Sequence, residues 1–124
     1  MKYKIVLKSL QVQAQMRILH WQTTSYAEHN AFGGFYDAMD DLIDKLVEAV
    51  QGKYGRIMLG GIDSLAVSDY GNLKINVFLL DIESFYCSEI FNCGIDPNRD
   101  SEIDNILQEI RAEIDKLKYL LTLK

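Results

Sequence analysis

The sequence has little proline and little cysteine. One proline in 124 residues, with 48% hydrophobic residues and no low-complexity tract, excludes a disordered tail and indicates a folded protein long enough for one core. Cys87 and Cys93 stand six positions apart, a spacing that fits neither a zinc knuckle nor a CxxC redox pair. We therefore expect a single domain over residues 1–124, with two reduced and mostly packed thiols.

The sequence also lacks an excess of basic charge and any long hydrophobic run. Its net charge of −5 argues against general electrostatic binding to nucleic acid, which requires a basic surface. The apolar run of residues 5–7 is far too short for a signal peptide, and no segment approaches the length of a membrane span. A cytoplasmic protein without a membrane partner is therefore expected.

The most informative stretch is residues 20–48, which contains both histidines of the chain. Ser25 and Glu28 have the spacing of a capping box, which predicts a helix over about residues 26–54. Apolar residues then recur at steps of three and four, as on one face of an amphipathic helix. They are Phe32, Phe35, Tyr36, Met39, Leu42, Ile43, Leu46, Val47 and Val50.

The other side of this helix is acidic. At about 100° per residue it gathers the side chains of His29, Asp37, Asp40, Asp41, Asp44 and Glu48. An imidazole beside several carboxylates at this spacing offers the ligands of a divalent metal such as iron, manganese or zinc. The same pattern is also typical of a solvated helix face with a structural histidine. The residues alone leave both interpretations open.

Three further helices are expected, over residues 3–24, residues 75–93 and from Ser101 to the carboxyl end. The first has two neighbouring apolar stripes, and the last is predicted to be capped by Ser101 with Asp104. The two stripes of the first helix are Tyr3, Leu7, Leu10, Ala14 and Trp21, and Val12, Met16 and Leu19. The third helix has Phe78, Leu79, Ile82, Phe85, Tyr86, Ile90 and Phe91, and the fourth has Ile103, Ile106, Leu107, Ile110, Ile114, Leu117 and Leu121.

The connections between these helices are short, long and short. Residues 23–25 join the first two helices, and residues 94–98 form a turn rich in Gly, Pro and Asn. Between the second and third helices lies a connection of about 20 residues, 55–74, long enough to contain a short helix. It allows the third helix to run parallel to the second, so the sequence predicts an all-α four-helix bundle with one long crossover.

In its motifs and their order the chain resembles the Dps branch of the ferritin-like superfamily, the miniferritins. The matching features are His20-Trp21, His29, Asp44 fifteen residues later, Glu48 four residues beyond that, Leu59-Gly60-Gly61, and the last helix within residues 96–121. The resemblance spans nearly the whole chain. No one motif is specific, and it is their order and spacing together that carry the resemblance.

Three departures from the family pattern favour a distant or shortened member, of a phage type: a crossover that is short for the family, a short link between the histidines and a missing carboxylate. His20 and His29 are nine residues apart, whereas the family has a longer link. Gly33 stands one turn after His29, where the family often has another carboxylate ligand.

The resemblance implies an iron site shared between two subunits. His20 and His29 of one chain, with Asp44 and Glu48 of its twofold partner, would hold Fe(II), and Asp37 and Asp40 are substitute ligands. Peroxide or oxygen would oxidise the iron, and a hollow dodecamer built from dimers would store the ferric product. Iron is the expected metal, with another divalent metal as the alternative. Trp21 would lie near the site as packing.

Two other functions compete with this one. The first is a ferritin-like assembly or interaction protein without catalysis, in which the metal site is degenerate, as Gly33 suggests. The second is DNA compaction, which in this family commonly uses a flexible basic tail. The first expected helix begins almost at Met1 and the chain stops at Lys124. DNA binding is therefore not expected.

Overall fold

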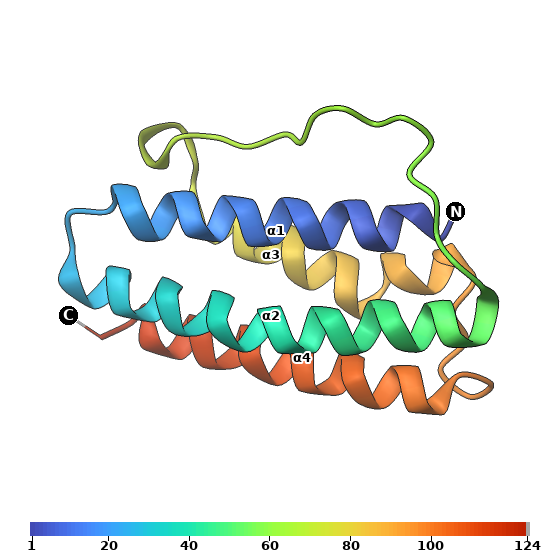
Figure 1. The fold of residues 1–124 in the computed structure, drawn as a ribbon. Helices are drawn as coiled ribbons and strands as arrows, with labels where there is room; N and C mark the ends of the chain where they lie inside the picture. Colours follow the sequence, from blue (N-terminus) through green and yellow to red (C-terminus); the bar gives the residue numbers. More distant parts are fainter. Residues whose placement is uncertain (124) are drawn as a thin grey trace.

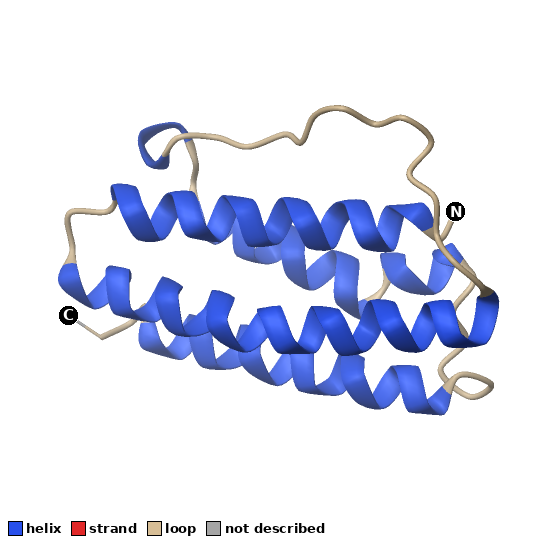
Figure 2. Ribbon diagram, in the orientation of Figure 1, coloured by secondary structure: helices blue, strands red, loops and turns tan. Residues whose placement is uncertain are grey.

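The computed structural model describes residues 1–123, which contain four α-helices and two short 3₁₀ helices (Figures 1 and 2). In chain order these are α1 (Tyr3–Gln22), α2 (Tyr26–Tyr54), η1 (Tyr70–Asn72), α3 (Ile75–Cys87), η2 (Glu89–Cys93) and α4 (Ser101–Leu120). The described residues include no β-strand. The predicted all-α bundle is confirmed at this level.

The four helices lie side by side around one apolar core. Figure 1 shows α2 and α3 running in one direction and α1 and α4 in the other, with the connection 55–74 passing along the outer side of α1. All four helices contribute to the core, which includes Met16 of α1, Phe32 of α2, Tyr86 of α3 and Leu107 of α4. This packing brings the end of α1 next to the start of α2.

Helix α1 is apolar on two sides, and only one of them is buried. Val12, Met16 and Leu19 are completely buried in the core. The stripe on the opposite side faces away from the core, because Leu10 is 44% exposed and Trp21 69% exposed. The bundle therefore leaves an apolar strip of α1 uncovered.

Helix α2 begins and ends where the sequence predicts. The Ser25 hydroxyl accepts a hydrogen bond from the Glu28 backbone N–H at 3.2 Å, which satisfies one donor of the first turn. The Glu28 carboxylate does not return to the Ser25 N–H, as a full capping box would require. It accepts instead from the Thr23 and Tyr70 hydroxyls at 2.6 Å and 2.7 Å.

The third and fourth helices differ from the sequence prediction at their ends. The helix expected over 75–93 breaks after Cys87, where the Ser88 hydroxyl donates to the Ser84 carbonyl and η2 follows. The expected cap of α4 is wrong, because Asp100 rather than Ser101 precedes the first turn. Asp104 instead pairs with Arg111 at 3.0 Å, and no side chain forms a capping hydrogen bond at the start of α4.

The connection 55–74 is almost entirely irregular and is held to the helices by glutamine side chains. The amide of Gln15 both donates to the Ser68 carbonyl and accepts from the Ser68 N–H, each at 2.8 Å. Gln22 accepts from the Tyr70 N–H at 2.7 Å, and Gln51 accepts from the Ile57 N–H at 3.0 Å.

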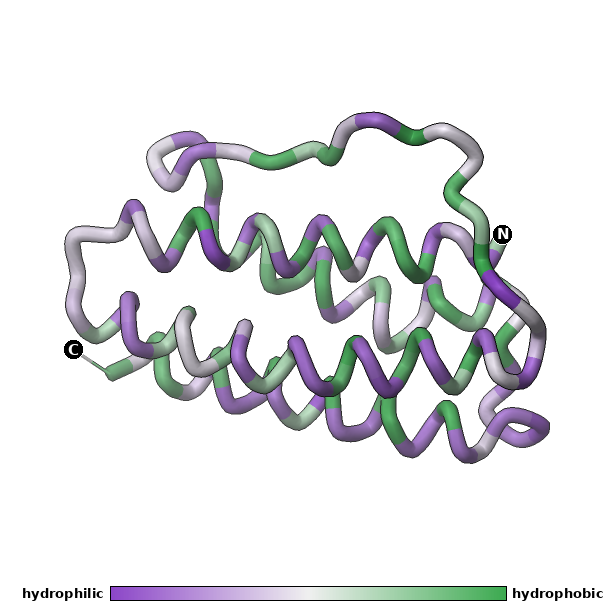
Figure 3. The backbone as a smooth tube through the Cα atoms, viewed as in Figure 1, coloured by the Kyte–Doolittle hydropathy of each residue, from purple (hydrophilic) through white to green (hydrophobic). Residues whose placement is uncertain are grey.

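Figure 3 shows hydrophobic stretches along this connection. The short helix expected within it is only the three-residue η1.

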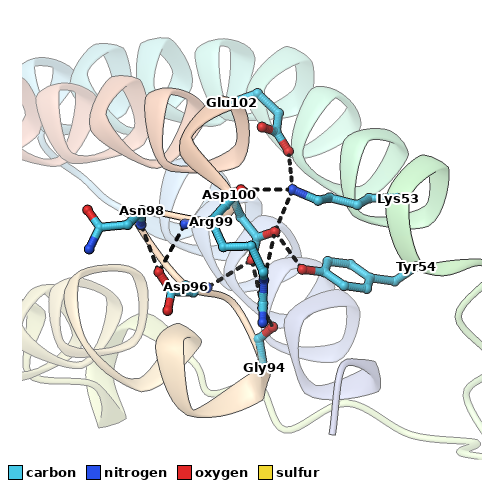
Figure 4. Close-up of polar contacts among 8 residues, drawn as sticks. All are labelled: Lys53, Tyr54, Gly94, Asp96, Asn98, Arg99, Asp100 and Glu102. Atoms are coloured by element: carbon cyan, nitrogen blue, oxygen red, sulfur yellow. Dashed lines mark hydrogen bonds and ion pairs between the residues drawn. The ribbon is translucent and has the colours of Figure 1, made fainter.

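The buried carboxylate of Asp100 links the end of α2 to the start of α4 (Figure 4). Asp100 is fully buried and accepts from the Tyr54 hydroxyl, the Asp96 N–H and the Arg99 guanidinium. Lys53 lies 2.7 Å from the same carboxylate. The Arg99 guanidinium, together with the Asp96 N–H, Lys53 and Tyr54, holds the pKa of Asp100 far below its ordinary value, although burial of the carboxylate acts in the opposite direction.

The turn after η2 forms where the sequence predicts it, and the two cysteines differ in burial. Gly94 adopts φ +87°, a left-handed conformation that glycine tolerates, at the predicted turn after η2. Both cysteines are reduced; Cys93 is buried as expected, whereas Cys87 is exposed. None of the helices described for residues 1–123 combines the length and the hydropathy that a membrane-spanning helix needs.

Candidate functional site

The two histidines lie against each other where α1 ends and α2 begins. Their rings stack with centroids 3.7 Å apart and planes inclined by 17°. The Nδ1 of His20 donates to the His29 carbonyl at 2.6 Å, and the Nδ1 of His29 donates to the His20 carbonyl at 2.8 Å. The nine-residue separation that looked short in the sequence is therefore what brings the two imidazoles together.

These reciprocal bonds fix which nitrogen of each ring carries the hydrogen. A carbonyl oxygen only accepts, so each Nδ1 must be protonated and must donate. In the neutral rings both Nε2 atoms then have lone pairs, and neither has a hydrogen-bond partner among residues 1–123. A backbone carbonyl on one ring nitrogen is the arrangement that orients histidine ligands in metal sites.

The pair also has a structural role. The His20 carbonyl lies in the last turn of α1, where no further backbone N–H of the helix can reach it. The His29 ring supplies the missing donor and so joins the end of α1 to the first turn of α2. Both the structural and the metal-binding interpretations of the histidines therefore remain consistent with the geometry.

Gly33 is required by the position of the His20 ring. A Cβ atom at this glycine would lie 2.9 Å from Cε1 and 3.1 Å from Nδ1 of His20. The neighbouring Gly34 has no atom within 4 Å of its own Cβ position. Gly33 thus makes room for the imidazole, so a carboxylate in its place would be incompatible with the observed histidine pair.

Beyond the histidines, further polar side chains form contacts between α1 and α2. Arg17 pairs with Asp40 at 3.0 Å, and Gln13 donates to the same carboxylate. Tyr36 meets the His20 ring edge to face, with centroids 5.3 Å apart. Asp40, expected as a substitute metal ligand, is therefore already occupied by partners of its own chain.

The remaining predicted carboxylates face away from the bundle. Asp37, Asp44 and Glu48 are exposed on α2 and have no ion-pair partner among the described residues. At 1.5 Å per residue, Asp44 lies about 22 Å along the helix from His29, and Glu48 lies about 28 Å away. One chain therefore does not bring its histidines and these two carboxylates together.

No single chain assembles a complete metal site in the part that is described. Within residues 1–123 there is no group of three or more His, Cys, Asp or Glu side chains arranged to hold a metal ion. The nearest aromatic residues to the histidines are Tyr26, which stacks on His29 at 6.3 Å, and Tyr36. Trp21, expected near the site, follows His20 and is 69% exposed.

Several contacts of this region were not predicted from the sequence. Arg17 and Gln13 belong to no motif and lie on a different helix from Asp40, so no spacing in the sequence brings them together. Tyr36 was expected only on the apolar face of α2. Glu28 and Tyr70 form a second cluster with Thr23 beside the link between α1 and α2. The hydrogen bond to Glu28 raises the pKa of the Tyr70 hydroxyl above its ordinary value of 10.0.

Comparisons with known proteins found a similar phage protein and a matching family model. The chain is 29% identical over 112 residues to an uncharacterized 14.6 kDa protein in the mobD-ri intergenic region of Enterobacteria phage T4, covering 90% of this chain and 80% of that protein. No solved structure matches. A family model described as a family of unknown function, DUF5856, matches residues 20–121, and therefore most of the bundle, including both histidines, belongs to the matched region. The chain belongs to the DUF5856 family.

Proposed function

We propose that this chain is a ferritin-like protein of the Dps type that binds Fe(II) between two copies of itself and oxidises it. The observation that carries the proposal is the stacked pair His20 and His29, with both Nδ1 atoms committed to carbonyls and both Nε2 atoms unpartnered in the described chain. On this proposal the long connection between α2 and α3 is the crossover of a ferritin-like bundle.

Each copy would supply half of the site. The exposed Asp44 and Glu48 of a second copy are the ligands that would complete the coordination of the iron, and Asp37 is a further carboxylate on the same face. Carboxylate oxygens and imidazole nitrogens together form a mixed set suited to Fe(II), and carboxylates also stabilise Fe(III). The apolar strip of α1, which includes Leu10 and Trp21, supplies surface that a second copy would cover.

The reaction on this proposal is the transfer of one electron from each Fe(II) to peroxide or oxygen. With hydrogen peroxide, two Fe(II) ions supply two electrons, the oxygen–oxygen bond breaks, and two protons are taken up to give two waters. The residues of this chain bind and orient the iron, since neutral Nε2 atoms and ionised carboxylates coordinate it. The ferric product would be stored in a closed shell, a dodecamer built from dimers.

The experiment must separate the metal-binding nitrogen from the structural one. In His20→Asn and His29→Asn the amide nitrogen replaces Nδ1 as donor to the carbonyl, and Nε2 is lost. The double variant should keep the wild-type helical circular dichroism and lose Fe(II) binding, measured by anaerobic titration, and Fe(II) oxidation, measured by absorbance of the ferric product. Asp115→Asn, an exposed change on α4, should retain both. Unchanged iron binding in the Asn variant would reject the histidines as ligands.

A non-catalytic assembly protein is the second candidate. It is favoured by the structural use of both imidazoles, which tie α1 to α2 through two backbone carbonyls. On that reading the wild-type protein binds no Fe(II) at stoichiometric concentrations, yet self-associates. The same titration therefore separates the two functions.

A further inference from the structure

Helix α3 exposes apolar side chains on the face opposite the core. Its inner face includes Phe78, Ile82 and Tyr86, which are buried. On the outer face Val77 is 60% exposed and Leu80 is 61% exposed. At about 100° per residue, two small exposed residues share this outer face with them. We call this face the α3 strip, and it consists of Val77, Leu80, Ser84 and Cys87.

The α3 strip has the spacing and the shape of a seam between two helices. Its members follow one another at steps of three, four and three residues, as in helices that pack along a common line. The large side chains lie in the first half of the strip and the small ones in the second half. Two antiparallel α3 helices would place Val77 opposite Cys87 and Leu80 opposite Ser84. Both pairings are centred at the level of Ile82, so one twofold axis generates them together.

The charges beside the α3 strip fit the same antiparallel arrangement. Lys74 directly precedes α3, Glu89 begins η2, and neither has an ion-pair partner in the described chain. The Ser84 hydroxyl donates to the Glu89 carboxylate at 3.4 Å, which places this carboxylate next to the strip. Lys74 stands about as far before Ile82 as Glu89 stands after it. The twofold axis would therefore bring Lys74 of each copy close to Glu89 of the other.

Lys74 and Glu89 also lie on the same side of the α3 strip. Lys74 is two helical turns before Asp81, which pairs with Lys8 of α1. Glu89 lines a hollow together with Lys4 of α1. Both residues thus lie on the side of α3 that faces α1. A twofold axis between antiparallel helices keeps this side of one copy next to the same side of the other, so the two opposite charges can meet.

The carboxylates nearest the centre of the α3 strip are already paired. Asp81 pairs with Lys8 of α1, and Glu83 pairs with Lys118 of α4. Like charges placed opposite each other across a contact are unfavourable. Because each of these carboxylates has a lysine of its own chain beside it, the approach of a second copy does not set unpaired like charges against one another.

We propose that two copies of this chain associate through the α3 strip, with their α3 helices antiparallel about a twofold axis at the level of Ile82. Helix α3 lies diagonally across the bundle from α2 (Figure 1), so this contact uses a different surface from the proposed iron site and does not depend on it. The seam involves one short helix of each copy, so the association is weak and reversible.

Disulfide cross-linking tests the antiparallel arrangement. In Val77→Cys the new thiol should form a disulfide with Cys87 of the second copy when the full chain is treated with oxidised glutathione. Peptide mass spectrometry identifies the joined positions. Positions 77 and 87 of one α3 helix are about 15 Å apart along its axis, too far for a disulfide within the chain. Wild type and Ala112→Cys, which is exposed on α4, should not form this dimer.

Charge reversal gives a second test that needs no cysteine. Lys74→Glu and Glu89→Lys should each weaken dimerisation about tenfold at low salt, since every dimer contains two such pairs. The two reversals combined in one chain should restore the wild-type affinity. Sedimentation of metal-free protein with a chelator measures these values. Both reversals suit the dipole of α3, with negative charge at its start and positive charge at its end, so they do not act by unfolding the helix.

Four results would overturn the proposal. Wild type that sediments as a monomer at its highest soluble concentration would reject a second copy as the occupant of the strip. A disulfide between two Cys87 residues in wild type would indicate parallel helices. Equal cross-linking of Cys87 in Val77→Cys and Ala112→Cys would indicate random collision. Failure of the combined charge reversal to restore the affinity lost in the single variants would reject the pairing of Lys74 with Glu89.

Discussion

At the scale of single residues, the histidine pair depends on one glycine more than on any other neighbour. Gly33 and Gly34 are adjacent in the same helix, and each costs about 1 kcal/mol relative to alanine through helix propensity. Only Gly33 contacts the His20 ring. No pattern in the sequence marks which of the two adjacent glycines is required, because that depends on a ring contributed by another helix.

Replacing each glycine by alanine separates these effects. Gly34→Ala should raise the free energy of unfolding by about 1 kcal/mol, through helix propensity alone. In Gly33→Ala the same gain is offset by the displaced His20 ring, whose hydrogen bond contributes about 1 kcal/mol, so the net change should be near zero or negative. Chemical denaturation measures both values. Imidazole ¹⁵N resonances should shift only in Gly33→Ala, and equal stabilisation of the two variants would contradict the observed contact.

Asp100 is the second residue whose role the sequence did not reveal. Its carboxylate is buried and receives hydrogen bonds from Tyr54 and the Asp96 backbone, whereas its cationic partners Lys53 and Arg99 also reach solvent. The sequence predicted a cap at Ser101 from spacing alone. A cap is a local pattern, but this carboxylate is held by an element 46 residues away along the chain.

The depressed pKa of Asp100 makes its contribution depend on pH in a definite direction. Because the folded-state pKa lies below the ordinary value of 3.8, the stabilisation is complete above that pH and declines as the pH falls below it. Asp100→Asn should therefore lower the unfolding free energy by about 2 kcal/mol at pH 7, and the difference from wild type should shrink at pH 3. Glu102→Gln, which touches the same lysine from an exposed position, should have little effect at pH 7. A difference that is equal at both pH values would contradict this assignment.

At the scale of elements, the length of α2 was predictable and the exposure of α1 was not. A run of apolar residues at helical spacing between Ser25 and Gly55 marked α2 at both ends. In α1 the two apolar stripes are equally regular, and periodicity does not say which one faces the core. The structure buries the stripe of Val12, Met16 and Leu19, whose neighbours on the bundle are large apolar side chains.

The glutamines of α1 form hydrogen bonds with the connection 55–74. Gln11, Gln15 and Gln22 lie on one side of the helix and bond to the backbone or side chains of the connection at Ala66, Ser68 and residues 69–70. Glutamine in a helix is compatible with many environments, so its pairing with a distant irregular segment was not predictable. The bundle thus holds the connection 55–74 through side-chain amides rather than through regular structure.

Gln15 is the strongest of these attachments and gives a test at this scale. Gln15→Met keeps the length of the side chain and removes both hydrogen bonds to Ser68, so amide hydrogen exchange near residues 66–70 should accelerate by about tenfold for each 1.4 kcal/mol lost. Helicity should not change. Gln108→Met, which removes an exposed contact with Asp104 on α4, should leave exchange in the connection as in wild type. Unchanged exchange in Gln15→Met would show that other contacts hold the segment.

At the scale of the whole molecule, the bundle has a single core, and its surface includes exposed apolar side chains and unpaired carboxylates. Part of α1 presents Leu10 and Trp21 to solvent, and α2 presents a row of carboxylates without partners in the described chain. The histidine pair and these carboxylates lie at different points along α2. A twofold arrangement of two copies would place the histidine pair of each copy beside the carboxylates of the other. Each dimer would then hold two equivalent sites.

The central claim is that each iron site needs both chains, and subunit mixing tests it most directly. One variant contains His20→Asn and His29→Asn, and the other contains Asp44→Asn and Glu48→Gln. On our account each variant alone lacks rapid Fe(II) oxidation, because every site has lost half of its ligands.

When the two variants are unfolded and reassembled together, half of the dimers pair one chain of each kind. Each such dimer has one intact site and one site without ligands, so about a quarter of the wild-type oxidation rate should return. Mass spectrometry confirms that mixed dimers have formed. No recovery in confirmed mixed dimers, or full activity in either variant alone, would contradict the shared site.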